Sequence, residues 1–580
     1  MAAVGVAVAT LAAACSASGD DRRTATPTDV PRAAGSTSTT LAAGTPTPTT
    51  ASTTPPTSPP ATAVTVSSTT LVPIERTGPV PLPGLLDESD RAFPDDPAVR
   101  TGTLDNGLRY YVRANDAPGA SAELRLAIDA GSVDESGPTG VAHFLEHMLF
   151  NGTASFPRNE LVDVLRGFGA SFGADINAST GFDATTYRLT VPNTDESLTT
   201  ALQVLSEWLS AATIDPAEVV AERGVVLDEW RVRTQSTEGR LLQVATDLFL
   251  DGTPYRNRLP IGLVADIERM EADPLRAYYD TWYRPDNAAV VVVGDIDVDA
   301  MEAEVGRWFG GATPRAETSS ARPGTVFDLD TVSEFGLHVD PDQPTVDVEV
   351  TLPLPAIDGA GTKATRAAFT DWMVYDALVR RLDDDLNAGV APFDEISRGT
   401  NSLVDGLDAP ALYATTDAAR AADALDALLD EYHRAAEFGF EDAEAAVARR
   451  SLLAFFQRGF DGRGSTQDAL YADRYVSAFL LDGNHPSIAD EFEVVGEILD
   501  GIDAAAMNRR FSARWTNSAP DVIISVPDDQ VAPVPDADGV AAAVAAAAAR
   551  PSTPRASIDT VPEALLAAPG PVEPIDTVTS

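Results

Sequence analysis

Two histidines and a glutamate stand inside one short apolar segment, His143-Phe144-Leu145-Glu146-His147. On a helix, His143 and His147 are one turn apart on the same face, so both imidazoles can reach one ion. Glu146 lies beside that face. The apolar neighbours predict that the helix packs into a core, where polar groups without a partner are costly. We therefore predict a zinc site here and favour it over a pair of hydrogen-bonded core histidines.

Two histidines leave a catalytic zinc site one protein ligand short, because such a site has three protein ligands and an open fourth position. We expect an acidic donor on the helix predicted at 216–233, which starts with Pro216 in its first turn. Glu222 and Glu229 are seven residues apart on this helix and share a face. Their spacing does not choose between them, and a solvated acidic stripe would show the same pattern.

The folded body is predicted to form two α+β units of similar size, at about 95–312 and 326–530. A polar segment with several glycines and prolines, 310–324, predicts the linker between them. The second unit begins like the first, with a strand and then a long helix. It has no pair of histidines at helical spacing, so only the first unit is expected to carry the metal.

In the first unit, strand-like segments alternate with helical patterns. The predicted strands are 108–112, 122–128, 187–191 and 288–293. The predicted helices are 139–150, 159–168, 196–212, 216–233, 238–249 and 299–309. In the second unit, a strand is predicted at 346–350 and a helix at 364–386.

The ends of the chain differ in composition from the body. Residues 1–15 are small and apolar and end in Cys15, which resembles a bacterial lipoprotein signal with its lipid-accepting cysteine. Residues 16–86 are rich in Thr, Ser and Pro and predict a disordered tether. We therefore expect an extracytoplasmic lipoprotein of a bacterial cell membrane. Residues 536–580, rich in Ala and Pro, are expected to be a low-complexity tail without a domain.

Charge and cysteine content exclude several classes of protein. The net charge of −47, from 41 basic and 88 acidic residues, argues against nucleic acid as a partner. With Cys15 as its single cysteine, the chain can form no internal disulfide. No other long apolar run follows, so we expect a lipid anchor rather than a membrane-spanning helix.

At these motifs the chain resembles the insulinase/pitrilysin family of zinc metallopeptidases, whose His-x-x-Glu-His order is the inverzincin signature. The resemblance covers about residues 95–530 and corresponds to the N-terminal half of long bacterial members. It rests on the segments 104–108, 131–133, 143–153, 173–178, 222–229 and 258–262.

The resemblance implies roles for particular residues of this chain. His143, His147 and Glu229 would bind Zn²⁺, and Glu146 would be the general base on the zinc-bound water. Glu222 would be a further acid of the catalytic site that supports the ligands without being one of them.

The resemblance also implies a fold and a way of binding substrate. Each unit would be a domain like those of insulinase and the mitochondrial processing peptidases, the two related by duplication. Asn177 and Ala178 lie in a segment similar to the sheet edge on which family members hold a peptide as an added strand. A complete family enzyme has four such domains around a chamber. We therefore expect a homodimer or a second half-sized subunit, unless the reading frame is truncated.

The function that follows is zinc-dependent endopeptidase activity on peptides or unfolded polypeptides. One alternative is a non-catalytic subunit or cell-envelope binding protein that retains the fold. Another is a metalloenzyme of a different reaction, such as an amidase acting on cell-wall peptides. The intact motif favours the peptidase, because a degenerate subunit would be expected to lose Glu146 or a histidine.

Overall fold

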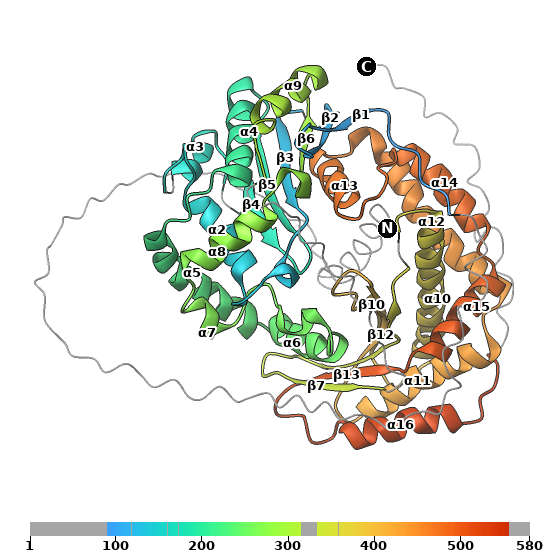
Figure 1. Cartoon of the computed structure of the whole chain (residues 1–580). Coiled ribbons are helices and arrows are strands. Elements are labelled where there is room, and N and C mark those ends of the chain that lie inside the picture. Colours follow the sequence, from blue (N-terminus) through green and yellow to red (C-terminus); the bar gives the residue numbers. More distant parts are fainter. Residues whose placement is uncertain are drawn as a thin grey trace, which may run out of the picture.

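The computed structural model of the chain describes residues 90–117, 119–158, 160–171, 173–314, 333–357 and 359–555 (Figure 1). The predicted signal at 1–15 and tether at 16–86 lie outside the described residues. Figure 1 shows two units, one coloured blue to green and the other yellow to red. Within the described ranges, no helix is both long and apolar enough to cross a membrane.

The first unit is built on a six-stranded sheet with the order β1-β2-β6-β3-β5-β4. Its strands are β1 (Val99–Thr103), β2 (Arg109–Ala114), β3 (Ser121–Ile128), β4 (Ile176–Thr180), β5 (Thr185–Pro192) and β6 (Ala288–Gly294). Its helices are α2 (Val141–Asn151), α3 (Glu160–Gly167), α4 (Asp195–Ser210), α5 (Pro216–Gln235), α6 (Thr237–Phe249), α7 (Val264–Ile267), α8 (Ala272–Trp282) and α9 (Val298–Phe309).

The second unit is built on a five-stranded sheet with the order β10-β12-β8-β13-β7. Its strands are β7 (Phe335–Val339), β8 (Val346–Thr351), β10 (Glu395–Thr400), β12 (Pro410–Thr416) and β13 (Asp521–Val526), with a small pair formed by β9 (Leu354–Pro355) and β11 (Leu407–Asp408). Its helices are α10 (Thr362–Asn387), α11 (Ala421–Phe438), α12 (Asp442–Gly462), α13 (Asp468–Leu480), α14 (Ile488–Asp500), α15 (Ala504–Asn517) and α16 (Ala537–Ala549).

The two sheets repeat one topology. The run β2-β6-β3-β5-β4 of the first sheet corresponds, strand by strand, to β7-β13-β8-β12-β10 of the second. In each sheet one pair is parallel, β2 with β6 and β7 with β13, and the other pairs of this run are antiparallel. This repeat confirms the predicted fold class of two homologous α+β domains.

Each sheet is covered on one face by a helix from the other unit. Val290 and Val292 of β6 face the core of the first unit, whereas Val291 and Val293 pack against Tyr475 and its neighbours on α13. Burial on both faces explains why β6 is a continuous apolar run. In return, α6 of the first unit packs on the second sheet, against β7 and β13.

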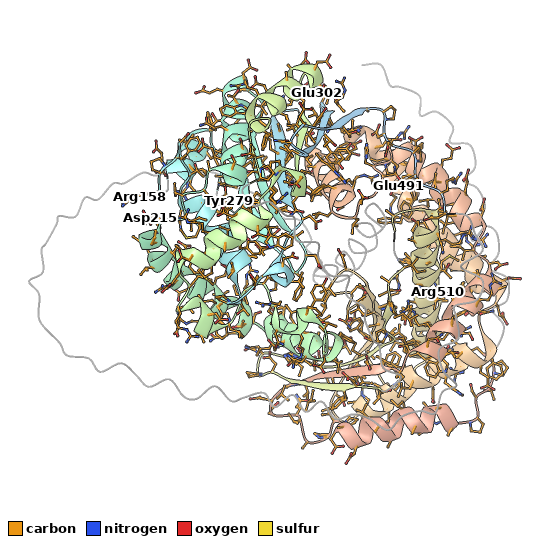
Figure 2. The ribbon with its side chains drawn as sticks, in the orientation of Figure 1. Arg158, Asp215, Tyr279, Glu302, Glu491 and Arg510 are labelled. Atoms are coloured by element: carbon orange, nitrogen blue, oxygen red, sulfur yellow. The ribbon has the colours of Figure 1, made fainter. Side chains whose placement is uncertain are left out.

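The predicted elements overlap observed ones, and the structure contains several more. In the first unit, strand β1 and helices α7 and α8 were not predicted, and β4 was indicated only by the resemblance at Asn177 and Ala178. In the second unit, only β8 and α10 were predicted. Helix α8 carries Pro274 in its first turn and two tyrosines, a residue type that favours strands. Tertiary contacts hold it in place: the hydroxyl of Tyr279, labelled in Figure 2, donates to the carbonyl of Trp208 at 3.0 Å.

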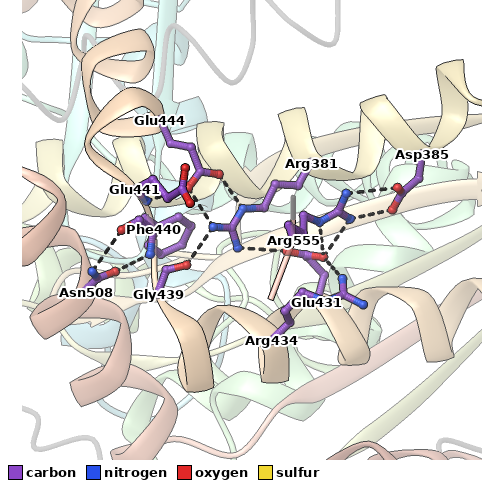
Figure 3. Close-up of polar contacts among 10 residues, drawn as sticks. All are labelled: Arg381, Asp385, Glu431, Arg434, Gly439, Phe440, Glu441, Glu444, Asn508 and Arg555. Atoms are coloured by element: carbon purple, nitrogen blue, oxygen red, sulfur yellow. Dashed lines mark hydrogen bonds and ion pairs between the residues drawn. The ribbon is translucent and has the colours of Figure 1, made fainter. Parts of the chain in front are cut away.

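The segment predicted as a low-complexity tail begins with a packed helix, which corrects that expectation. Val540, Val544 and Ala547 of α16 are buried in the core of the second unit, against α11. In the repeat, α16 follows the last strand as α9 does in the first unit. After α16, Arg555 pairs with Asp385 at 2.6 Å and with Glu431 (Figure 3). An alanine-rich composition therefore conceals a structural element.

Candidate metal centre

Helix α2 carries the histidine motif and is positioned by its N-terminal end. The carboxylate of Glu135 accepts hydrogen bonds from the backbone N–H of Gly140 and of Ala142, at 3.0 and 2.9 Å, and so caps the helix. Gly140 has a φ of 79°, and a Cβ there would lie 3.0 Å from Cα of Gly262. Only glycine fits this contact, which holds the start of α2 against the loop before α7.

The two predicted histidine ligands lie side by side. His143 is 3% exposed, and the ring centroids of His143 and His147 are 4.8 Å apart. Apolar neighbours on α2, including Phe144 and Leu145, lie in the core and anchor the helix. The helical spacing therefore does what the sequence predicted: it directs both imidazoles to one place.

The carboxylate of Glu229 on α5 completes a donor set with these histidines. One oxygen lies 3.0 Å from Nε2 of His147, and the other lies 3.5 Å from Nε2 of His143. One ligand atom from each of the three residues lies within 4.8 Å of the others. Two imidazole nitrogens and a carboxylate oxygen are a donor set that zinc prefers. The residues present thus fit the predicted ion.

Glu222 contacts the donor set from the side away from the proposed ion, at Nδ1 of His147. Its Oε1 is 2.9 Å from Nδ1 of His147, and its Oε2 accepts a hydrogen bond from the amide of Asn151 at 2.7 Å. Both glutamates come from one face of α5, as their spacing predicted. The tertiary structure distinguishes them, because Glu229 meets Nε2 of the ring and Glu222 meets Nδ1.

These contacts shift the pKa values of His147, Glu222 and Glu229. Burial lowers the pKa of His147, but hydrogen bonds with Glu222 and Glu229 outweigh it and raise this pKa to about 9. Burial would raise the pKa values of both glutamates. Contacts with His147 and Asn151 lower the pKa of Glu222, and contacts with His143 and His147 lower that of Glu229. Two ionised carboxylates thus face the imidazoles, an arrangement suited to a cation.

Glu146 is 7% exposed and lines the same pocket as the donor set. The hydroxyl of Thr180, at the end of β4, donates to Oε2 of Glu146 at 2.5 Å. The sequence offered no signal for this contact, since 34 residues separate the two. The pocket has a volume of about 620 Å³ and is lined by residues of α2, α3, β4 and α5.

Two further residues at the site were missed, although helical spacing could have found them. Asn151 stands four residues after His147 on α2 and contacts Glu222. Arg233 stands four residues after Glu229 on α5, and its guanidinium lies 2.6 Å from the carboxylate of Glu229. Both contacts orient a carboxylate of the cluster.

Asn177 and Ala178 lie on β4, which is an edge strand of the first sheet, and both line the pocket. The N–H of Thr190 donates to the carbonyl of Asp175, and the N–H of Gly181 donates to that of Ala184, both at 2.8 Å. In an antiparallel ladder these bonds fall on alternate residues. The N–H and C=O groups of Ala178 therefore point away from β5, and the N–H donates to Oδ1 of Asn177 at 2.9 Å.

The fold and this donor set define a peptidase-like metal site, and the family comparisons agree. Residues 110–259 match the model of the insulinase family, peptidase family M16, and residues 269–452 match that of the peptidase M16 inactive domain. The chain belongs to the insulinase/pitrilysin family.

Two curated relatives are similar to the chain over most of its folded part. The probable zinc protease PqqL of Escherichia coli is 30% identical over 419 residues, which are 71% of this chain and 44% of the relative. The zinc protease PQQL-like of Arabidopsis thaliana is 31% identical over 432 residues, 73% of this chain and 42% of the relative. The chain thus spans less than half the length of these relatives.

Solved structures share the fold at low sequence identity. The first half of the periplasmic protease PqqL from Escherichia coli superposes with a TM-score of 0.75 at 24% identity, covering 80% of this chain and 100% of that chain. Pitrilysin superposes with a TM-score of 0.63 at 18% identity, covering 84% of this chain and 51% of that chain.

Proposed function

We propose that the chain is the zinc-binding part of a metalloendopeptidase that hydrolyses peptides or unfolded polypeptides. The observation that carries the proposal is the convergence of His143, His147 and Glu229 on one point of a pocket that Glu146 also lines. The names of the zinc protease relatives support zinc as the ion and peptide-bond hydrolysis as the reaction.

In this proposal His143, His147 and Glu229 hold the ion, which when bound polarises the scissile carbonyl and acidifies water. Glu146 takes the proton from the attacking water and delivers it to the leaving amine. Glu222 holds Nδ1 of His147 and thereby keeps Nε2 directed at the ion. No covalent bond to the protein is needed.

The substrate would bind along β4. A peptide added to this edge would pair with the outward C=O of Ala178, and with its N–H by replacing Oδ1 of Asn177 as the acceptor. Main-chain pairing requires an extended backbone and few particular side chains. This geometry favours unfolded polypeptides over folded proteins as substrates.

Compartment and partner are part of the same proposal. The structural relative from Escherichia coli is described as periplasmic, which supports an extracytoplasmic place for this chain. The segment 1–15 would supply the lipid anchor. For the partner, we propose a second half-sized subunit or a second copy, which would complete the four-domain arrangement that the family resemblance implies.

Cleavage of a fluorescence-quenched unfolded polypeptide by the purified chain tests the function. We expect activity that a chelator abolishes and zinc restores, and that Glu146→Gln abolishes while zinc stays bound. Glu268→Gln, an exposed carboxylate at the end of α7, is the matched control. Full activity in Glu146→Gln would refute the proposed general base.

The same assay separates the alternative of a non-catalytic subunit. The match of residues 269–452 to an inactive domain does not decide between the two, because the donor set lies in residues 110–259, outside that match. A zinc-loaded chain that binds the polypeptide without cleaving it, alone or as a dimer, would support the alternative and overturn the peptidase.

A further inference from the structure

Thr180 joins the edge strand to the proposed catalytic base. It is the last residue of β4 and pairs with Thr185 of β5. Its side-chain hydroxyl donates to Oε2 of Glu146 at 2.5 Å, a short bond between a hydroxyl and a carboxylate. Among the described hydrogen bonds, this is the one that reaches the Glu146 carboxylate from another element.

The main chain of Thr180 faces the open edge. Asp175 and Gly181, which flank β4, form hydrogen bonds toward β5. Because such bonds alternate along an antiparallel pair, the odd-numbered residues of β4 face β5. Thr180, like Ala178, therefore directs its N–H and C=O away from β5. The side chain alternates in the same period, and that of Thr180 points to α2, as its contact with Glu146 requires.

The main chain of Thr180 thus lies where a peptide strand would add, and its side chain contacts Glu146, the proposed base. We propose that Thr180 is a positioning residue, whose hydroxyl holds Oε2 of Glu146 so that the other carboxylate oxygen is left for the attacking water. This inference rests on the proposed function. The side chain of Thr180 contacts α2 and its backbone lies at the sheet edge. Strand β4 would therefore both bind the peptide and orient the base.

Thr180→Val tests the inference, because it removes the hydroxyl and keeps the shape and the strand preference. Loss of a hydrogen bond to a carboxylate predicts a fall in kcat of about tenfold or more. KM should change less than about twofold, since backbone pairing at the edge is intact. Thr180→Ser, which restores a hydroxyl, should recover most of kcat.

The matched control is Thr190→Val on the neighbouring strand. The Thr190 hydroxyl also donates to a carboxylate, that of Glu123 at 2.9 Å, but on a part of the sheet away from the metal pocket. We expect this control to keep kcat. Bound zinc and the melting temperature should be the same in both valine variants.

A binding measurement separates positioning from substrate affinity. In the Glu146→Gln background, a labelled unfolded polypeptide should bind with the same affinity whether residue 180 is Thr or Val, by fluorescence anisotropy. Full kcat in Thr180→Val, or an equal loss in Thr180→Ser, would overturn the inference. Absence of cleavage by the wild-type chain would instead refute the proposed function.

Discussion

Oε1 of Glu222 lies 2.9 Å from Nδ1 of His147. The opposite nitrogen of this ring, Nε2, faces the carboxylate of Glu229 at 3.0 Å. The imidazole is therefore held between an acid that orients it and an acid that shares the proposed ion with it. Carboxylates in the orienting position fix the tautomer and the direction of a metal-binding histidine.

Glu222→Gln is expected to weaken zinc binding by about 10- to 100-fold, because a neutral amide holds Nδ1 of His147 less strongly than a carboxylate does. Glu229→Gln, which alters the donor set itself, should weaken it further. Competition with a chromogenic chelator measures both affinities. Asp228→Asn, exposed beside Glu229, is the control. Equal affinities of Glu222→Gln and the wild type would contradict the orienting role.

Helix α6 of the first unit packs on the sheet of the second unit, and an ion pair between the two units holds it there. Arg240 lies 2.6 Å from Asp340, whose side chain is fully buried at the end of β7. Arg240→Met would leave that carboxylate buried without its main partner, so the free energy of unfolding should fall by about 3 kcal/mol. Chemical denaturation measures this change.

A second substitution shows whether the loss comes from the pair. Asp340→Asn in the Arg240→Met background removes the unpaired charge and should restore more than half of the lost stability. If the double variant were as unstable as the sum of both single variants, the two residues would not be coupled.

Val540 of α16 is buried in the core of the second unit. Val540→Asp should destabilise the chain by at least about 2 kcal/mol, because it places a carboxylate in an apolar contact. Ala545→Asp, on the exposed face of the same helix, should have little effect. Thermal unfolding of both variants checks this, and equal melting temperatures would show that α16 does not contribute to the fold.

Glu349 of β8 predicts a pH dependence of stability. It is 5% exposed and accepts a hydrogen bond from the Thr351 hydroxyl at 2.9 Å, yet burial raises its pKa from 4.5 to about 7. A carboxyl whose pKa is higher in the folded state stabilises the fold at low pH. That contribution is complete below about pH 4.5 and is lost as the pH rises through 7, by about 3 kcal/mol.

Glu349→Gln should therefore reduce the loss of stability between pH 5 and pH 8, measured by denaturant unfolding. A smaller slope should remain, because burial also raises the pKa of Asp521 on β13. Glu395→Gln, an exposed residue of β10, is the control. An unchanged slope in Glu349→Gln would show that Glu349 is not the titrating group.

Several strands and helices could be predicted because their signals are local. The run at 288–293 predicted the central strand β6, and Pro216 marked the start of α5. No local pattern predicted strand β4, since its sequence Ile-Asn-Ala-Ser-Thr is mostly small and polar and its pairing with β5 holds it in place. Only the family resemblance indicated a sheet edge at Asn177 and Ala178. Helix α16 was not predicted because its sequence is mostly alanine and shows no apolar periodicity. Its packing against α11 appears only in the tertiary structure.

The sequence by itself determined that His143, Glu146 and His147 share one helix and that Glu222 and Glu229 share another, because helical period is a property of neighbouring residues. The tertiary structure decided which nitrogen of His147 each glutamate meets, and it brought Thr180 to Glu146. The physical reason is distance along the chain. Contacts between residues 34 to 82 positions apart depend on how α2, α5 and β4 pack, and no local pattern records that packing.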